Sequence, residues 1–262
     1  MCIYEYIGRF YMINLKSKNW EIANIETVLF DKDGTFIDLH YFWGKMTELR
    51  AREIINRFSL DDILFEKLCA YLGYDIATGK MLSDGITALY SRVKIIEIFK
   101  ENLKELGLMT TEDELTKIFD NVSESFYKNI NEYTNPIESA INFIKLLHAK
   151  GVKLGIVTSD SVVSTELTLK HFGWEHLFDV VIGRESSPYT KESGEPTKLA
   201  LKQLNANPQT TVMIGDAPMD YISAQNAGIE KTILVATGQL SIDELVCVSD
   251  FVTLDLEKVY VI

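Results

Sequence analysis

Cysteine is scarce in this chain of 262 residues, which contains only three. Cys2, Cys69 and Cys247 lie far apart, form no CxxC pair and have no histidine cluster nearby. An odd number of widely spaced cysteines argues against a disulfide framework and is typical of free thiols in a reducing compartment. We therefore expect a cytoplasmic protein.

The chain also lacks an excess of basic residues and a long hydrophobic run. Its 26 Lys and Arg against 38 Asp and Glu give a net charge of -12 at pH 7, which argues against nucleic acid or an anionic membrane as the main partner. Charged residues interrupt the apolar residues of positions 1–20, so this segment resembles neither a signal peptide nor a membrane span. A small anionic substrate stays compatible with the charge, because a bound metal reverses the local sign.

The segment VLFDKDGT, residues 28–35, is the most informative stretch of the sequence. Three apolar residues run directly into polar ones, as in a buried parallel strand that ends at a ligand site. Asp31 and Asp33 repel each other when both are charged, unless a cation lies between them or one holds a proton. Hard oxygen ligands favour Mg²⁺. Gly34 allows a sharp backbone turn at the end of the strand.

Two kinds of hydrophobic pattern divide the chain into an inserted segment and a surrounding core. Residues 39–135 have helical periodicity without an evident buried strand, with predicted helices at 47–58, 61–72, 86–106 and 111–127. In the core, residues 1–38 and 136–262, strands alternate with helices, the strands being at 26–30, 152–157, 180–183, 211–214, 231–235 and 251–254. This alternation predicts an α/β fold, a doubly wound parallel sheet with an inserted all-α domain.

Polar side chains follow three of the predicted strands, at Asp31 and Asp33, at Thr158 and Ser159, and at Asp216. Because parallel strands bring their carboxyl ends to one edge of the sheet, we expect these side chains to converge.

Two further groups accompany these strand ends. Lys191 lies in the polar segment before the predicted helix at 197–204. The sequence GDAPMD, residues 215–220, places Asp220 at a helix start, where support of a metal site and capping of the helix are equally favoured and do not exclude each other.

These motifs together resemble the haloacid-dehalogenase-like hydrolase superfamily, in its phosphoglycolate-phosphatase and β-phosphoglucomutase-like branch. The first motif, DxDGT, is residues 31–35, and the second is the strand that ends at Thr158. The third is the lysine at position 191, and the fourth, GDxxxD, is residues 215–220. The helical insertion resembles the C1 cap of that family.

The resemblance implies a phosphatase that acts through a covalent intermediate. Asp31 attacks phosphorus and forms an aspartyl-phosphate, and Asp33 serves as general acid and then general base. Mg²⁺ is bound by Asp31, by the backbone carbonyl of Asp33 and by Asp216. The implied substrate is a small phosphorylated metabolite; phosphoglycolate, a sugar phosphate and a nucleotide stay open, as does the oligomeric state.

The resemblance also implies which residues bind the phosphoryl group. Thr158, with Ser159 beside it, and Lys191 stabilise the equatorial oxygens. The supporting residues are Gly34, Thr35 and Asp220.

The sequence departs from the family pattern at two places. Lys32 stands where the family usually has an apolar residue, and alternation along the strand predicts that it faces away from the metal. Lys191 is followed by Glu192 instead of the common proline, so Lys198 is a competing but less favoured candidate.

Two arginines and an aromatic run in or beside the insertion receive structural interpretations. Arg50 and Arg92 could reach a substrate anion, but arginines on helices are usually solvated, and neither is assigned a role. Residues 40–43, HYFW, are interpreted as packing at the junction of core and insertion.

Four alternatives to a phosphatase are weighed. A phosphomutase shares the same core and cap, although Thr35 favours a phosphatase. A receiver-type phosphoacceptor domain also pairs an aspartate with a hydroxyl and a lysine, but it needs neither Asp33 nor a large insertion. A dehalogenase requires no metal and lacks the second acid, and a silent scaffold is disfavoured because every catalytic position is filled.

Overall fold

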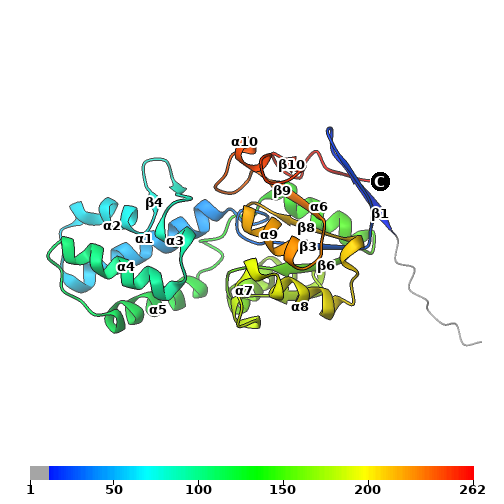
Figure 1. The fold of residues 1–262 in the computed structure, drawn as a ribbon. Helices are drawn as coiled ribbons and strands as arrows, with labels where there is room; N and C mark the ends of the chain where they lie inside the picture. The colour runs from blue at the N-terminus through cyan, green and yellow to red at the C-terminus, as the bar shows by residue number, and fades with distance from the viewer. Residues whose placement is uncertain (1–11) are drawn as a thin grey trace, which may run out of the picture.

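The computed structural model describes residues 12–262, which form an α/β lobe and a helical lobe beside it (Figure 1). The first lobe is built on a six-stranded sheet in the order β10-β9-β8-β3-β6-β7, in which every pair of neighbours is parallel. The strands are β3 (Thr27–Phe30), β6 (Lys153–Val157), β7 (Val180–Ile182), β8 (Thr211–Gly215), β9 (Lys231–Val235) and β10 (Phe251–Thr253).

Strand β3 lies in the middle of the sheet because the chain winds outward from it on both sides. It pairs with β6 on one side and β8 on the other, so the strand order reverses beside it. Ligands of open α/β sheets bind at such a reversal, outside the carboxyl ends of the strands. The predicted position of the site at the end of this strand therefore agrees with the topology.

Helices cover both faces of the sheet, as the doubly wound prediction requires. Val28 and Phe30 pack into one hydrophobic cluster, whereas Leu29 packs into another with residues of α8 and α9. The flanking helices are α6 (Glu138–Ala149), α7 (Val162–Phe172), α8 (Glu195–Leu204), α9 (Pro218–Asn226) and the short α10 (Ile242–Leu245). The α/β fold predicted from the sequence is confirmed.

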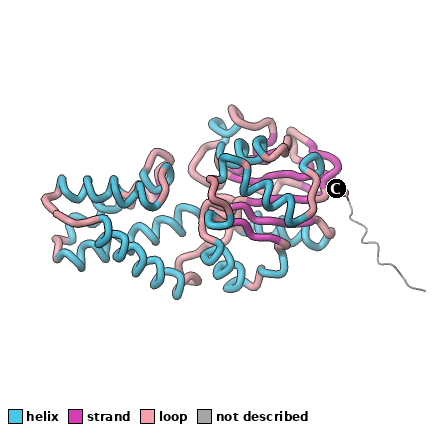
Figure 2. Tube along the Cα trace, turned by 60° about the horizontal axis from the view of Figure 1, so that its bottom comes forward, coloured by secondary structure: helices cyan, strands magenta, loops and turns pink. Residues whose placement is uncertain are grey.

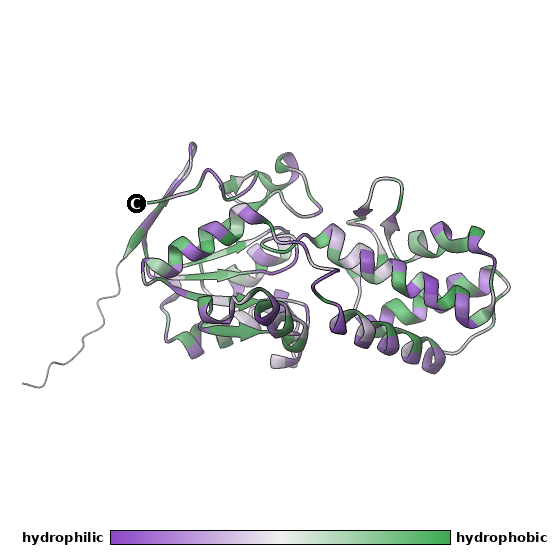
Figure 3. Cartoon of the chain, turned by 180° about the vertical axis from the view of Figure 1, so that it is seen from behind, coloured by the Kyte–Doolittle hydropathy of each residue, from purple (hydrophilic) through white to green (hydrophobic). Residues whose placement is uncertain are grey.

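The insertion forms the second lobe, which consists mainly of helices (Figure 2). These are α1 (Leu39–Phe58), α2 (Phe65–Tyr71), α3 (Ile86–Leu89), α4 (Arg92–Glu105) and α5 (Glu112–Lys128). Their apolar sides build a separate hydrophobic cluster, and the exposed sides are polar (Figure 3). The lobe also contains a small antiparallel pair, β4 (Tyr74–Asp75) and β5 (Lys80–Met81), which the sequence pattern did not predict. The domain boundaries at 38/39 and 135/136 stay predictions.

Helix α1 begins eight residues earlier than the predicted start at position 47. The Asp38 side chain caps it by accepting a hydrogen bond from the Tyr41 backbone N–H at 3.0 Å. The aromatic residues at 41–43, interpreted as junction packing, are therefore part of the first turns of the helix. As a result α1 extends from the α/β lobe into the helical lobe.

The residues before β3 form a second, smaller sheet. Strands β1 (Ile13–Lys16) and β2 (Glu21–Ile25) pair antiparallel, and β11 (Tyr260–Val261) joins them. Their buried side chains, from Ile13 to Ile25, extend the main hydrophobic cluster. No function is inferred from the sequence for positions 1–25, and positions 1–11, including Cys2, lie outside the described residues.

Two further observations concern the described residues alone. Cys69 is buried and Cys247 is exposed, and both are free thiols. Between positions 12 and 262, no helix combines the length and the apolar character needed to cross a bilayer.

Candidate active site

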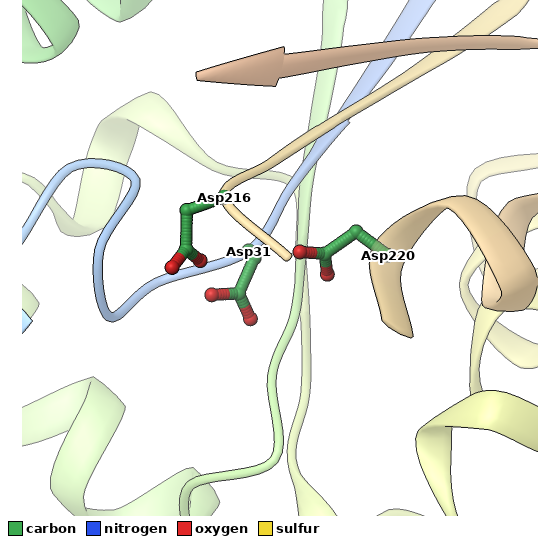
Figure 4. Close-up of side chains that lie close together, drawn as sticks. All are labelled: Asp31, Asp216 and Asp220. Carbon is green, nitrogen blue, oxygen red and sulfur yellow. The ribbon is translucent and has the colours of Figure 1, made fainter. Parts of the chain in front are cut away.

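Three carboxylates meet at the carboxyl edge of the sheet: Asp31, Asp216 and Asp220 (Figure 4). Asp31 follows β3, Asp216 follows β8, and Asp220 lies in the first turn of α9. Strands β3 and β8 are parallel neighbours with Phe30 beside Ile214, so Asp31 follows at the level of Gly215, one residue before Asp216. One oxygen from each carboxylate lies within 4.8 Å of the others, and all three residues are buried.

Lys191 supplies the positive charge that this cluster contains. Its Nζ lies 2.5 Å from Asp31 Oδ1 and 2.6 Å from Asp220 Oδ1. Burial raises the pKa of Asp31 to about 7, with Lys191 opposing the shift and Asp220 adding to it. Burial and the charges of Asp31 and Asp220 hold the pKa of Asp216 well above its usual value. The carboxylates therefore remain under strong repulsion despite the lysine.

The composition of the cluster suits a divalent cation. Three carboxylates and one ammonium group leave two negative charges in a buried space. The donor atoms are all oxygens, the set that Mg²⁺ prefers. The side chain of Asp33 is not part of this cluster. The predicted contact of Asp33 with the metal is through the backbone carbonyl, and it stays a prediction.

Two glycines make room for the Asp216 carboxylate. Gly34 has φ +85°, and a Cβ at this position or at Gly238 would overlap the Asp216 side chain. The Thr237 hydroxyl donates to the Gly34 carbonyl oxygen at 2.6 Å and ties the two loops together. The sequence indicated Gly34 for the turn, and the structure adds the close approach of a carboxylate.

Asp33 lies in its own set of contacts, beside the cluster. Lys32 Nζ lies 2.6 Å from Asp33 Oδ1, and the Trp43 indole N–H donates to Asp33 Oδ2 at 3.2 Å. Burial raises the pKa of Asp33, against the opposing effect of Lys32. A carboxyl group that keeps its proton at higher pH than usual is suited to general acid catalysis.

Lys32 is fully buried and pairs with two carboxylates. Besides Asp33, its Nζ lies 3.0 Å from Asp160 Oδ2 and 4.2 Å from the centre of the Phe42 ring. Burial disfavours the charge, yet Asp33 and Asp160 together raise the pKa of Lys32 above its usual value. Within residues 12–262 it forms no ion pair with the three clustered carboxylates, in agreement with the predicted orientation.

The predicted phosphate-binding hydroxyls have mainly local contacts. Thr158 Oγ1 accepts a hydrogen bond from the Asp160 backbone N–H at 3.0 Å, which leaves its hydroxyl proton available to donate. Ser159 is exposed, and its Oγ lies 3.5 Å from Met219 Sδ. Thr35 is buried, and its Oγ1 has no hydrogen-bond partner among the described residues.

Lys191, and not Lys198, lies in the cluster. Lys198 Nζ pairs with Glu195 at 2.8 Å on the exposed side of α8. Asp220 caps the start of α9, because its Oδ2 accepts from the Ala217 backbone N–H at 3.1 Å, while its Oδ1 faces Lys191; its support of a metal site stays a prediction.

Sequence reasoning missed two partners of the motif residues, Trp43 and Asp160. Trp43 belongs to the aromatic run after the first motif, and Asp160 follows the second motif by two residues. Beside Trp43, His40 joins the lobes: its Nδ1 accepts from the Met81 N–H at 3.1 Å, so its Nε2–H donates to the Gly238 carbonyl at 3.2 Å. Trp43 packs against the hydrophobic clusters of both lobes, so junction packing describes both residues, and the contact of Trp43 with Asp33 comes in addition.

Fold and cluster define an α/β enzyme with an acidic, lysine-paired site at the carboxyl edge of a parallel sheet. The model of the haloacid dehalogenase-like hydrolase family matches residues 25–228, and the chain belongs to that family. The resemblance inferred from the four motifs is confirmed.

Known proteins similar to the chain support the same assignment. The chain is 25% identical over 210 residues to pyrophosphatase PpaX of Halalkalibacterium halodurans, covering 80% of this chain and 83% of the relative. Among solved structures, a predicted phosphoglycolate phosphatase from Haemophilus somnus has a TM-score of 0.68 at 18% identity, with 89% of this chain and 95% of the other covered. A subfamily IA hydrolase from Geobacter sulfurreducens has a TM-score of 0.60 at 15% identity, with 89% and 93% covered. The two structures support the fold.

Proposed function

We propose that the protein is a Mg²⁺-dependent phosphatase that hydrolyses a small phosphomonoester through an aspartyl-phosphate. The observation that carries this proposal is the position of the Asp31 carboxylate. It lies 2.5 Å from Lys191 within a buried group of three carboxylates, and a second acid follows two residues later. The pyrophosphatase named among the relatives supports hydrolysis at phosphorus.

The residues divide the reaction into two displacements. An Asp31 oxygen attacks phosphorus while the ester P–O bond breaks, and Asp33 gives its proton to the leaving alkoxide oxygen. Water then attacks the phosphorus of the aspartyl-phosphate, Asp33 takes a proton from that water, and the bond to Asp31 breaks. Phosphate leaves, and both carboxyl groups return to their starting states.

The other site residues bind and orient the phosphoryl group. Lys191, already beside Asp31, and the free proton of the Thr158 hydroxyl stabilise charge on the equatorial oxygens. Mg²⁺, held by Asp31, Asp216 and the Asp33 carbonyl with Asp220 in support, would supply further neutralisation of that charge. Trp43 orients the Asp33 carboxyl through its indole N–H.

A substrate assay tests the proposal and separates it from its rivals. We expect release of phosphate from p-nitrophenyl phosphate and from some metabolite phosphates, loss of this activity in EDTA, and its return with Mg²⁺. Phosphorylation of the protein without turnover would instead indicate a receiver-type domain, and an isomerised sugar phosphate would indicate a mutase. Turnover that persists unchanged in EDTA would contradict the metal dependence.

The two candidate lysines offer a matched comparison. Replacing Lys191 by Met removes the ammonium group beside Asp31, and we expect kcat/KM to fall by roughly 10²- to 10³-fold, as for the loss of one preorganised electrostatic contact. Lys198→Met removes only a half-exposed pair with Glu195 and should change kcat/KM by less than about twofold. Equal effects of the two substitutions on p-nitrophenyl phosphate hydrolysis would show that Lys191 has no special role.

A further inference from the structure

Arg50 is a buried cation without a counter-ion among the residues that the structure describes. It lies on α1 with only 5% of its surface exposed, so the prediction that it is solvated is wrong. Its Nε has no hydrogen-bond partner, and within residues 12–262 it forms no ion pair. The guanidinium carbon lies 4.4 Å from the centre of the Phe119 ring. A cation–π contact offsets only part of the cost of burying a charge, so the structure leaves this group without an anion.

The Arg50 side chain faces the junction of the two lobes. Arg50 is seven residues after Trp43 on the same helix, which places both on one side of α1, about 10.5 Å apart along its axis. Trp43 contacts Asp33, and side chains of a helix lean toward its N-terminus. Arg50 is therefore directed back toward the end of the helix that reaches the candidate active site.

A second arginine without an acidic partner lies on the opposite side of this junction. Arg184 follows β7 at the carboxyl edge of the sheet, and its backbone N–H donates to the Asp160 carbonyl at 2.9 Å. The Arg184 side chain is exposed and forms no ion pair within the part of the chain that the structure describes. Arg92, also nearby, is neutralised by Asp120 at 2.6 Å.

The electrostatics of Arg50 agree with this arrangement. Burial, together with the charges of Arg92 and Arg184, lowers the pKa of Arg50 to about 9, and Tyr127 acts in the opposite direction. Because Asp120 pairs with Arg92, the two of these three arginines that lack an acidic partner among the described residues are Arg50 and Arg184, one from each lobe. Such a concentration of unneutralised charge favours the binding of an anion.

We propose that Arg50 and Arg184 bind a second anionic group of the substrate, on the opposite side of the substrate from the phosphate that is hydrolysed. This inference rests on the proposed phosphatase function and names its substrate class: phosphomonoesters that also carry a second phosphate or a carboxylate. Arg50 forms the floor of this second anion site from the helical lobe, and Arg184 approaches it from the sheet.

The position of Arg50 sets the spacing between the two anionic groups. Two turns of α1 separate Arg50 from Trp43, which contacts Asp33. The Arg50 side chain extends toward the N-terminus of α1, so its guanidinium group lies closer to Asp33 than its Cα does. The second anion therefore lies several ångströms beyond the reacting phosphate, roughly 5 to 10 Å away. A spacer of sugar or glycerol size fits this distance, whereas the two phosphorus atoms of pyrophosphate share one bridging oxygen and are too close.

Pairs of substrates that differ only in the second anion test the proposal. Glucose 1,6-bisphosphate is compared with glucose 6-phosphate, and 3-phosphoglycerate with glycerol 3-phosphate, so that the two pairs distinguish a phosphate from a carboxylate. We expect the wild type to prefer the doubly anionic member of at least one pair by about 10- to 100-fold in kcat/KM, as for a charge-assisted, bidentate contact. Arg50→Met, which retains the apolar stem, should abolish this preference and leave p-nitrophenyl phosphate within about threefold.

Two further variants keep the result interpretable. Arg184→Met changes an exposed residue, so it should fold normally and still reduce the preference, even if Arg50→Met proves unstable. Arg52→Met is the matched control, because Arg52 lies on the same helix but is half exposed and pairs with Asp62 at 2.9 Å. It should leave both substrate classes unchanged.

The outcomes separate this inference from the proposed function. No hydrolysis of any phosphomonoester by the wild type would overturn the phosphatase itself. Hydrolysis of p-nitrophenyl phosphate with no preference within either pair would overturn only the second anion site. Equal losses on singly and doubly anionic substrates in Arg50→Met and Arg184→Met would likewise show a structural role for both arginines.

Discussion

Replacing Asp31 by Asn should abolish turnover while leaving the protein at least as stable as the wild type. The amide cannot attack phosphorus at a useful rate, and loss of a nucleophile of this kind lowers kcat by at least about 10³-fold. Burial raises the pKa of Asp31 to about 7, so the negative charge of this carboxylate is disfavoured by its surroundings. A neutral amide relieves that repulsion, so stability and activity should change in different directions.

Phosphate release and thermal unfolding in EDTA measure the two effects together. Asp38→Asn is the control, because asparagine caps a helix as well as aspartate does and Asp38 caps α1 from outside the cluster. Thr158→Ala should weaken turnover without abolishing it, since one hydroxyl is only part of the phosphate-binding set. An Asp31→Asn variant that retains activity would remove Asp31 as the nucleophile, and a large drop in melting temperature would contradict the electrostatic argument.

Replacing Lys32 by Met should cost about 3 to 5 kcal/mol of the free energy of unfolding. Lys32 is fully buried, and its removal leaves Asp33 and Asp160 without their shared counter-ion. Removing one member of a buried ionic group is costly, because the remaining charges stay buried and lose the attraction that offset their desolvation. Denaturant unfolding of the metal-free protein measures the change.

Lys16→Met provides a comparison at the N···O distance of the Lys32–Asp160 pair, 3.0 Å. The Lys16–Glu21 pair is also 3.0 Å long, but its side chains are 54% and 45% exposed, so we expect a change below about 1 kcal/mol. Adding Asp160→Asn to Lys32→Met removes one of the two orphaned charges and should recover part of the stability. If Lys32→Met and Lys16→Met lower the free energy of unfolding by the same amount, burial does not increase the contribution of the Lys32 ion pairs to stability.

The part of the candidate site that lies in short motifs at strand ends could be predicted from the sequence. An apolar run that ends in DKDGT identifies β3 and its two aspartates, and the second acidic motif after β8 identifies Asp216 and Asp220. Parallel pairing then brings Asp31 and Asp216 together whatever the intervening chain does. The helical periodicity of the insertion likewise follows from spacing alone. The start of α1 at Leu39 was not predicted, because the aromatic residues at 40–43 were interpreted as junction packing and not as part of a helix.

Contacts between elements far apart in the chain could not be predicted in this way. The pairing of β1 with β11 joins the two ends of the described chain, and no local pattern specifies it. The contact of Trp43 with Asp33 depends on the angle at which α1 leaves the sheet. The burial of Arg50 depends on how α1 packs against α5, because an amphipathic pattern shows which side of a helix is apolar but not which polar residue lies beneath a neighbouring lobe.

The sequence by itself determined the α/β alternation, the helical insertion, the family and the acidic motifs, because strand period, strand ends and motif spacing are properties of short segments. Only the tertiary structure decided that Lys32 pairs with Asp33 and Asp160, that Asp220 completes the carboxylate cluster and that Arg50 is buried with no acidic partner between positions 12 and 262. Pairing and burial of charges depend on which distant segments pack together, and that is a property of the whole fold.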